Sequence, residues 1–186
     1  MRCVYCSSDK GLTRDHVPPK CLIRSPYPAD LLTVPACADC NNRYSRDEEY
    51  FRLVIVGLLC HTAEADSLFD GSISRSMDRR PSLEELMFGS LEAAGSQVVL
   101  DIHYPRVFRV AEKIARGLEF AVAGRTYPLQ QHFTVEFQEV EGGSQQVVFG
   151  PDFTFLQQAW GWEFTLFNSE RFVVVAEPGA VAEGVA

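Results

Sequence analysis

The sequence has 186 residues, of which 46% are hydrophobic and 11% aromatic, a composition typical of a folded globular protein rather than of a disordered chain. Its formal net charge of −8 argues against a protein that coats nucleic acid or an anionic membrane through bulk electrostatics. Because no apolar run approaches the ~20 residues of a membrane span and the N-terminus lacks the apolar stretch of a signal peptide, we expect a soluble, cytoplasmic protein that contacts no membrane.

Charge and proline divide the chain unevenly. Residues 1–50 carry seven basic and seven acidic side chains, whereas residues 51–186 carry ten basic and 18 acidic ones. Half of the ten prolines lie in the first 35 residues, which predicts an extended, turn-rich beginning. We expect three parts, namely a module over 1–62, an α+β accessory domain over 63–177 and a flexible tail over 178–186.

The middle of the chain predicts two helices. The first is expected from just after Cys40 to about Thr62, because acidic residues occupy its early turns and an apolar stretch continues it. The following segment, 63–82, is polar and is broken by glycine and proline. A serine three residues before a glutamate then forms a capping box for a short helix over 82–93.

A third helix is expected from Pro105 to about Val122, ended by Gly124. Apolar residues recur along it at helical spacing, and its opposite side carries four basic residues three or four positions apart. We call these four the basic stripe: Arg106, Arg109, Lys113 and Arg116.

The rest of the chain favours antiparallel strands. Apolar and polar residues alternate over 133–138, and the glycines of 141–144 predict a hairpin turn. The expected strands are 97–103, 133–138, 145–149, 162–167 and 171–176, of which the last two form a second hairpin.

Four of the six cysteines form two Cys-x-x-Cys pairs. In a reducing compartment such spacing points to metal binding rather than to a disulfide framework. Each pair can present two thiolates to one tetrahedral Zn²⁺, and four thiolates leave no open position for a substrate, so this zinc would be structural. The ligands would be Cys3, Cys6, Cys37 and Cys40.

Between the two pairs stands Asp15-His16, and Asn41 directly follows the second pair. In this order and spacing, the chain resembles the HNH endonuclease family in its four-cysteine, zinc-stapled branch, over about residues 1–55. The resemblance implies an α+β protein in which an N-terminal zinc-bound ββα-metal module packs on a C-terminal portion of helices and antiparallel strands. It also implies an enzyme that hydrolyses phosphodiester bonds of DNA.

By the same resemblance, Asp15 and Asn41 would hold one catalytic Mg²⁺ or Mn²⁺, and His16 would be the general base that activates water. The residue types agree, because carboxylate and amide oxygens are hard ligands and histidine accepts a proton near neutral pH. Glu48, on the same face of the expected helix as Asn41, is a further candidate ligand or else a charge favourable to the helix N-terminus.

Two departures from the family pattern keep a second hypothesis open. Leu32 stands where the family usually has its middle asparagine, and the family's final histidine is absent. These favour a non-catalytic zinc module that binds nucleic acid or a protein partner. The acidic C-terminal portion favours a third hypothesis, a structural interaction domain, and could form a homodimer or meet another protein.

Contacts to DNA phosphates are expected from basic side chains near the motif and from the basic stripe, although a solvated helix face would show the same stripe. The residues near the motif are Arg14, Lys20 and Arg43.

Overall fold

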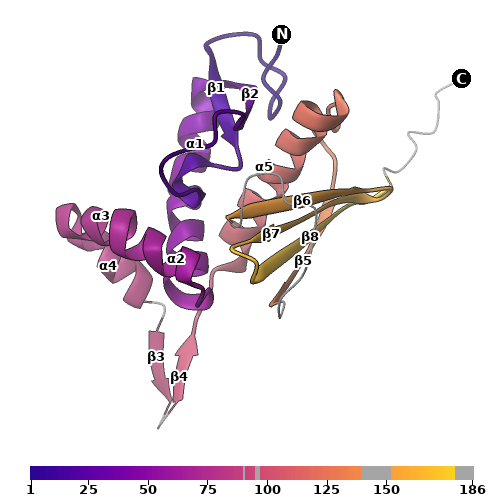
Figure 1. Cartoon of the computed structure of the whole chain (residues 1–186). Helices are drawn as coiled ribbons and strands as arrows, with labels where there is room; N and C mark the ends of the chain where they lie inside the picture. The colour runs from indigo at the N-terminus through magenta and orange to yellow at the C-terminus, as the bar shows by residue number, and fades with distance from the viewer. Residues whose placement is uncertain (90, 95–96, 140–151, 179–186) are drawn as a thin grey trace, which may run out of the picture.

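The computed structural model describes residues 1–89, 91–94, 97–139 and 152–178. It has the α+β fold predicted from the sequence, with an antiparallel sheet in the C-terminal part and the four paired cysteines together near the N-terminus (Figure 1). The expected turn at 141–144 and strand 145–149 lie outside the described residues.

The chain begins with a strand–strand–helix unit. Strands β1 (Leu12–Val17) and β2 (Leu32–Cys37) pair antiparallel, and helix α1 (Ala38–Val54) follows β2 without a loop. A short 3₁₀ turn, η1 (Lys20–Leu22), lies in the connection between the strands. The helix starts before the predicted residue because Cys37 caps it, its Sγ accepting a hydrogen bond from the Cys40 backbone N–H.

Regular α-helix ends earlier than predicted, at Val54. The chain continues as a wider π-helical turn, η2 (Ile55–Leu59), in which the Cys60 N–H reaches back to the Ile55 carbonyl. The polar segment 63–82 is also largely helical, because Thr62 caps a new helix and apolar residues along it face the core. Its elements are α2 (Ala63–Leu68), the π-helical η3 (Phe69–Ile73) and α3 (Ser74–Arg79).

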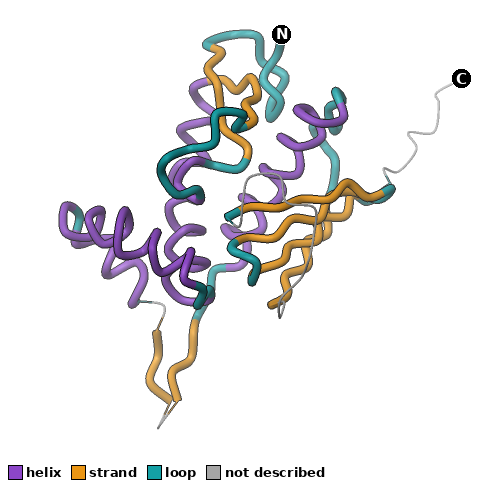
Figure 2. Tube along the Cα trace, in the orientation of Figure 1, coloured by secondary structure: helices purple, strands orange, loops and turns teal. Residues whose placement is uncertain are grey.

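The helix predicted over 82–93 is shorter, because α4 (Pro81–Phe88) ends before a strand. Its start depends on a proline in the first turn rather than on a side-chain cap. Strand β3 (Leu91–Ala94) then pairs with β4 (Gln97–Leu100) in a hairpin that projects away from the rest of the molecule (Figure 2).

The third predicted helix is confirmed as α5 (Tyr104–Ala123), which ends where Gly124 takes a left-handed φ of 67°. A four-stranded antiparallel sheet follows in the order β5-β8-β7-β6. The hairpin of the last two strands was predicted, whereas β6 was not. The strands are β5 (Phe133–Glu139), β6 (Phe153–Gln158), β7 (Gly161–Leu166) and β8 (Glu170–Ala176).

Helix α5 lies between the N-terminal unit and the C-terminal sheet (Figure 1). The indole N–H of Trp162 on β7 donates to Glu119 of α5 at 3.0 Å, and the ring of Phe51 on α1 lies 5.4 Å from that of Phe172 on β8. Buried apolar residues of the N-terminal unit, the helices and the sheet form one hydrophobic cluster. The core therefore fixes α5 against both the N-terminal unit and the sheet.

At its closest point, α5 touches the N-terminal hairpin through a glycine. A Cβ atom placed on Gly117 would stand 2.5 Å from Cγ2 of Val17, far inside van der Waals contact. The absence of a side chain at residue 117 is what lets α5 approach β1.

Among the described residues, no helix has both the length and the apolar character needed to cross a membrane.

Candidate functional site

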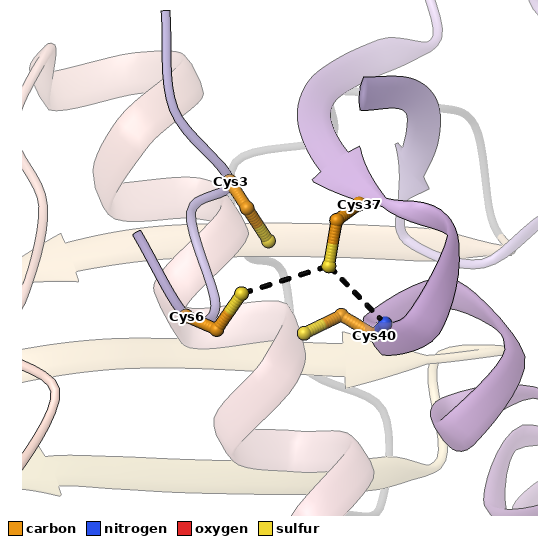
Figure 3. A group of neighbouring side chains, drawn as sticks. All are labelled: Cys3, Cys6, Cys37 and Cys40. Carbon is orange, nitrogen blue, oxygen red and sulfur yellow. Dashed lines mark hydrogen bonds between the residues drawn. The ribbon is translucent and has the colours of Figure 1, made fainter. Parts of the chain in front are cut away.

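The four paired cysteines come together at the end of the N-terminal hairpin (Figure 3). Their sulfur atoms all lie within 4.8 Å of one another, and those of Cys6 and Cys37 are 3.6 Å apart. A tetrahedral ion with metal–sulfur bonds of about 2.3 Å separates its sulfurs by about 3.8 Å. The four sulfur atoms are therefore close enough to share one ion. In the described part of the chain, no other group of three or more histidine, cysteine or acidic residues is close enough to bind a metal.

Local backbone geometry forms the two halves of this candidate metal site, and we call its four cysteines (Cys3, Cys6, Cys37 and Cys40) the metal centre. In the first half, the Cys3 carbonyl accepts from the Ser7 N–H in a tight turn, and the Val4 N–H donates to the Pro35 carbonyl of β2. In the second half, Cys37 ends β2 and Cys40 lies one turn into α1. The centre thus connects the N-terminal turn, β2 and α1.

The thiols of the metal centre differ in how readily they ionise. A hydrogen bond from the Cys40 backbone N–H outweighs burial and lowers the pKa of Cys37 to about 7. Burial, with its neighbouring thiols, raises the pKa of Cys40 well above the ordinary thiol value. A metal binds cysteines as thiolates, so Cys37 is the ligand that ionises most readily near neutral pH. Metal binding must release protons from the remaining thiols.

Asp15, the expected ligand of the catalytic metal, forms an ion pair with Lys113. Oδ2 of Asp15 lies 2.7 Å from Nζ of Lys113 on α5 and accepts a 2.8 Å hydrogen bond from the Tyr5 hydroxyl. The same ammonium pairs with Glu48 of α1. We call Asp15, Glu48 and Lys113 the ionic cluster.

Two members of the ionic cluster are buried, since Lys113 is 1% exposed and Asp15 6%, and the Glu48 side chain keeps 15% of its surface exposed. Burial favours a neutral Lys113, but the carboxylates of Glu48 and Asp15 outweigh it and raise the pKa of the ammonium. Burial prevails at Glu48, whose pKa is raised in spite of Lys113. Lys113 therefore stays charged and holds β1, α1 and α5 together.

His16 lies on the opposite face of β1 from Asp15. In the hairpin register Asp15 pairs with buried Val34, whereas His16 pairs with exposed Thr33. The imidazole is half-buried, and burial, aided by the charges of Lys20 and Lys113, lowers its pKa. At neutral pH it is therefore an uncharged imidazole able to accept a proton.

The other two expected ligands of the catalytic metal, Glu48 and Asn41, differ in whether they contact Lys113. Glu48 shares the Lys113 ammonium with Asp15, across the helix–strand interface. Asn41 is half-buried in the first turn of α1, directly after Cys40, and is not among the described partners of that ammonium.

The basic stripe is largely engaged inside the protein. Both Arg106 and Arg109 bind the carboxylate of Asp47 on α1, at 2.8 and 2.6 Å. Arg116 is buried, donates to the carbonyls of Pro128 and Gln131 and lies over the Phe133 ring. Arg109, with a side chain that is 49% exposed, keeps the most contact with solvent among the stripe residues in ion pairs.

The basic residues near the motif are all on the surface. Arg14 projects from β1 and Lys20 follows its end, each exposed to solvent. The Lys20 ammonium lies over the Tyr27 ring, and the Arg43 guanidinium lies over the Tyr44 ring. These side chains stay available to an anion.

Two residues of this region were missed by the sequence analysis. Tyr5 stands between the cysteines of the first pair, where nothing in the sequence suggests that its hydroxyl binds Asp15. The sequence predicts acidic residues in the early turns of α1, and one of them, Asp47, anchors two arginines of α5. The matching signal was the basic stripe itself, since four cations on one helix face call for acids on the facing element.

Comparison with known proteins gives no relative. The chain matches no protein family, no curated protein and no solved structure at a significant level. The resemblance to HNH endonucleases therefore depends on the sequence alone, namely on the cysteine pairs, Asp15-His16 and Asn41. The structure shows that the four cysteines are close enough to bind a metal.

Proposed function

We propose that this protein hydrolyses phosphodiester bonds of DNA, with His16 as the general base and zinc held by the four cysteines as a structural ion. The observation that carries the proposal is the environment of His16. An imidazole kept neutral by its surroundings lies on the open face of β1, next in sequence to an acidic residue and on the hairpin whose end holds the four cysteines able to bind a metal. A neutral imidazole there can take the proton from an attacking water.

The proposed reaction includes one Mg²⁺ or Mn²⁺, which when bound would stabilise negative charge on the phosphate and on the leaving oxygen. Asp15 and Asn41 supply hard oxygen donors of the type that such ions prefer. In the structure the Lys113 ammonium lies 2.7 Å from Oδ2 of Asp15, so binding of a divalent ion by Asp15 requires that this contact opens. Since Lys113 has a second carboxylate partner in Glu48, it can release Asp15 without becoming an unpaired buried charge.

A plasmid-nicking assay with Mg²⁺, Mn²⁺ and Ca²⁺ in turn tests this function. Wild-type protein is expected to nick DNA, and His16→Ala is expected to lose about 10²–10⁴-fold in rate, the usual contribution of a general base. Zinc content should stay the same in the variant, because His16 lies outside the metal centre. His61→Ala, at an exposed histidine distant in sequence, is the matched control and should cleave like wild type.

A second candidate function, a non-catalytic zinc module that binds nucleic acid, is favoured by the ionic cluster. Because Lys113 neutralises Asp15 within a buried site, the acid can serve the fold without ever binding a divalent ion. DNA binding by wild-type protein, with no nicking in any divalent metal, would select this candidate. A protein that neither nicks nor binds DNA would exclude both.

A further inference from the structure

A small pocket opens beside α2, distant in sequence from the ionic cluster. Its volume is about 150 Å³, the space of about five water molecules at roughly 30 Å³ each. Its polar lining consists of two arginines and three serines, and none of the described lining residues is acidic. These residues are Arg24, Arg75, Ser25, Ser67 and Ser72.

A third arginine stands behind the pocket wall. Arg52 of α1 is 7% exposed, and its Nη1 donates to Oγ of Ser72, one of the lining hydroxyls, at 3.3 Å. Its Nε is buried and has no hydrogen-bond partner among the described residues. A buried guanidinium with an unused donor is costly, since removing a charge from water requires compensation by an opposite charge or by hydrogen bonds.

No described acid compensates this charge through an ion pair. Glu48, one helical turn before Arg52, is directed to Lys113 instead. The thiol of Cys21 feels the charge of Arg52, yet burial raises its pKa to about 12, so it is not a thiolate at neutral pH. Arg52 therefore brings a positive charge, which no described acid pairs with directly, next to a pocket that two further arginines line.

One lining arginine, Arg24, is held in place by the carboxylate of Asp152. The Arg24 backbone N–H and Nε both donate to Asp152, at 2.8 and 2.7 Å. Asp152 lines a neighbouring pocket of about 330 Å³ that shares Arg24, Ser25 and Ser67 with the small one. Both oxygens of this carboxylate accept hydrogen bonds from Arg24, through its backbone N–H and its Nε. The two outer guanidinium nitrogens of Arg24 can therefore donate to another acceptor.

We propose that the pocket between the 23–28 loop and the α2–η3 segment binds a phosphate-class oxyanion, held by Arg24, Arg75 and serine hydroxyls and balanced by the buried charge of Arg52. The pocket is too small for a drug-sized ligand, for which cavities begin near ~300 Å³, but has room for one tetrahedral anion. The same chemistry fits a free phosphate or a phosphate of a nucleic-acid backbone. The site is independent of the proposed hydrolysis at His16.

Thermal unfolding of the full-length, zinc-loaded protein tests this site. Inorganic phosphate is expected to raise the Tm in a saturable way, whereas potassium chloride at the same ionic strength is not, because only a ligand of the native state stabilises by mass action. Arg52→Met is expected to fold, since it removes a buried charge that no described acid pairs with, and to lose the phosphate-dependent rise. Arg75→Gln changes an exposed residue and should bind phosphate about tenfold more weakly.

The matched control is Arg79→Met, at an exposed arginine that lies outside the pocket lining, and it should respond to phosphate like wild type. A dinucleotide distinguishes the two sources of phosphate. Stabilisation by the dinucleotide through Arg52 assigns the site to backbone phosphates, and stabilisation by inorganic phosphate alone assigns it to free phosphate. A wild-type Tm that neither compound changes, or an equal rise in Arg52→Met, overturns the proposal.

Discussion

The two polar clusters of the N-terminal unit are close together and are assembled in different ways. The metal centre uses two short turns, each with its own backbone hydrogen bonds, within the first 40 residues. The ionic cluster joins β1, α1 and α5, and Lys113 is about 100 residues from Asp15 in the sequence. The metal centre is thus a local structure, whereas the ionic cluster exists only when the whole chain has folded.

This difference assigns the two clusters different tasks. An ion held by the metal centre would secure the start of α1 to the N-terminal turn in a segment with few helices or strands of its own. The ionic cluster secures the unit to α5, and through α5 to the sheet. The metal centre is expected to be disrupted by loss of one cysteine ligand, and the ionic cluster by loss of the Lys113 charge.

Removal of the metal should have the largest effect. Cys40→Ser, or a strong chelator, is expected to release one zinc ion per chain and to unfold residues 1–54 first, because structural zinc contributes about 10–16 kcal/mol in small zinc-dependent peptides. Elemental analysis gives the zinc content, and hydrogen exchange locates the segment that opens. Cys60→Ser, at a buried cysteine outside the centre, is the control that keeps its zinc. A fully folded protein without metal would contradict the structural role.

Loss of the buried ammonium should come next. Lys113→Met leaves two carboxylates facing each other without a cation, which is expected to lower the free energy of unfolding by about 3–5 kcal/mol. Urea unfolding measures this loss. Millimolar Mg²⁺ or Ca²⁺ should restore part of the stability of the variant, since a divalent ion can replace the ammonium between Asp15 and Glu48.

The double variant Lys113→Met with Asp15→Asn provides the control for that experiment. It retains a single carboxylate and should gain little from divalent ions. If Lys113→Met alone is as stable as wild type, or if both variants respond equally to Mg²⁺, the cluster is not the cation site inferred from the geometry.

The smallest effect is expected at Asp47, on the rim of the same interface. Burial alone would raise the pKa of this carboxyl, but hydrogen bonds from Arg106 and Arg109 outweigh burial and lower it. A lowered native pKa means that the stabilisation is complete above the ordinary value of 3.8 and is lost as the pH falls through the native value. Asp47→Asn should therefore be less stable than wild type at neutral pH, and urea midpoints of the two should converge on acidification. A gap that is independent of pH would show that packing, not charge, is lost.

Local patterns predicted the parts of the fold that local interactions decide. Helix α5, with its proline start and its glycine end, and the β7–β8 hairpin were foreseen in nearly their observed bounds. The π-helical turns after Val54 and Leu68 were not, because the wide turns depend on how the helices pack rather than on sequence period. Strand β3 was predicted as helix, since strand pairing with β4 prevailed over a weak helical pattern.

The candidate site shows the same division. The cysteine spacing is enough to predict a shared metal centre, because each pair folds on itself. Nothing in the sequence indicates that Lys113 binds Asp15, or that Tyr5 donates to the same oxygen. These contacts follow from how α5 crosses the hairpin, which pattern analysis of single elements does not reach.

The contact of Gly117 with Val17 has a consequence for anyone who engineers this protein. Replacing a helical glycine by alanine is a common stabilising substitution, worth about 1 kcal/mol in helix propensity. Here the added methyl group would clash with Val17 and push α5 away from β1. Residue 117 lies one helical turn after Lys113, whose ammonium binds Asp15 of β1. A screen for thermostability is then expected to reject residue 117, and a variant carrying a larger side chain there would separate Lys113 from Asp15 without altering either of them.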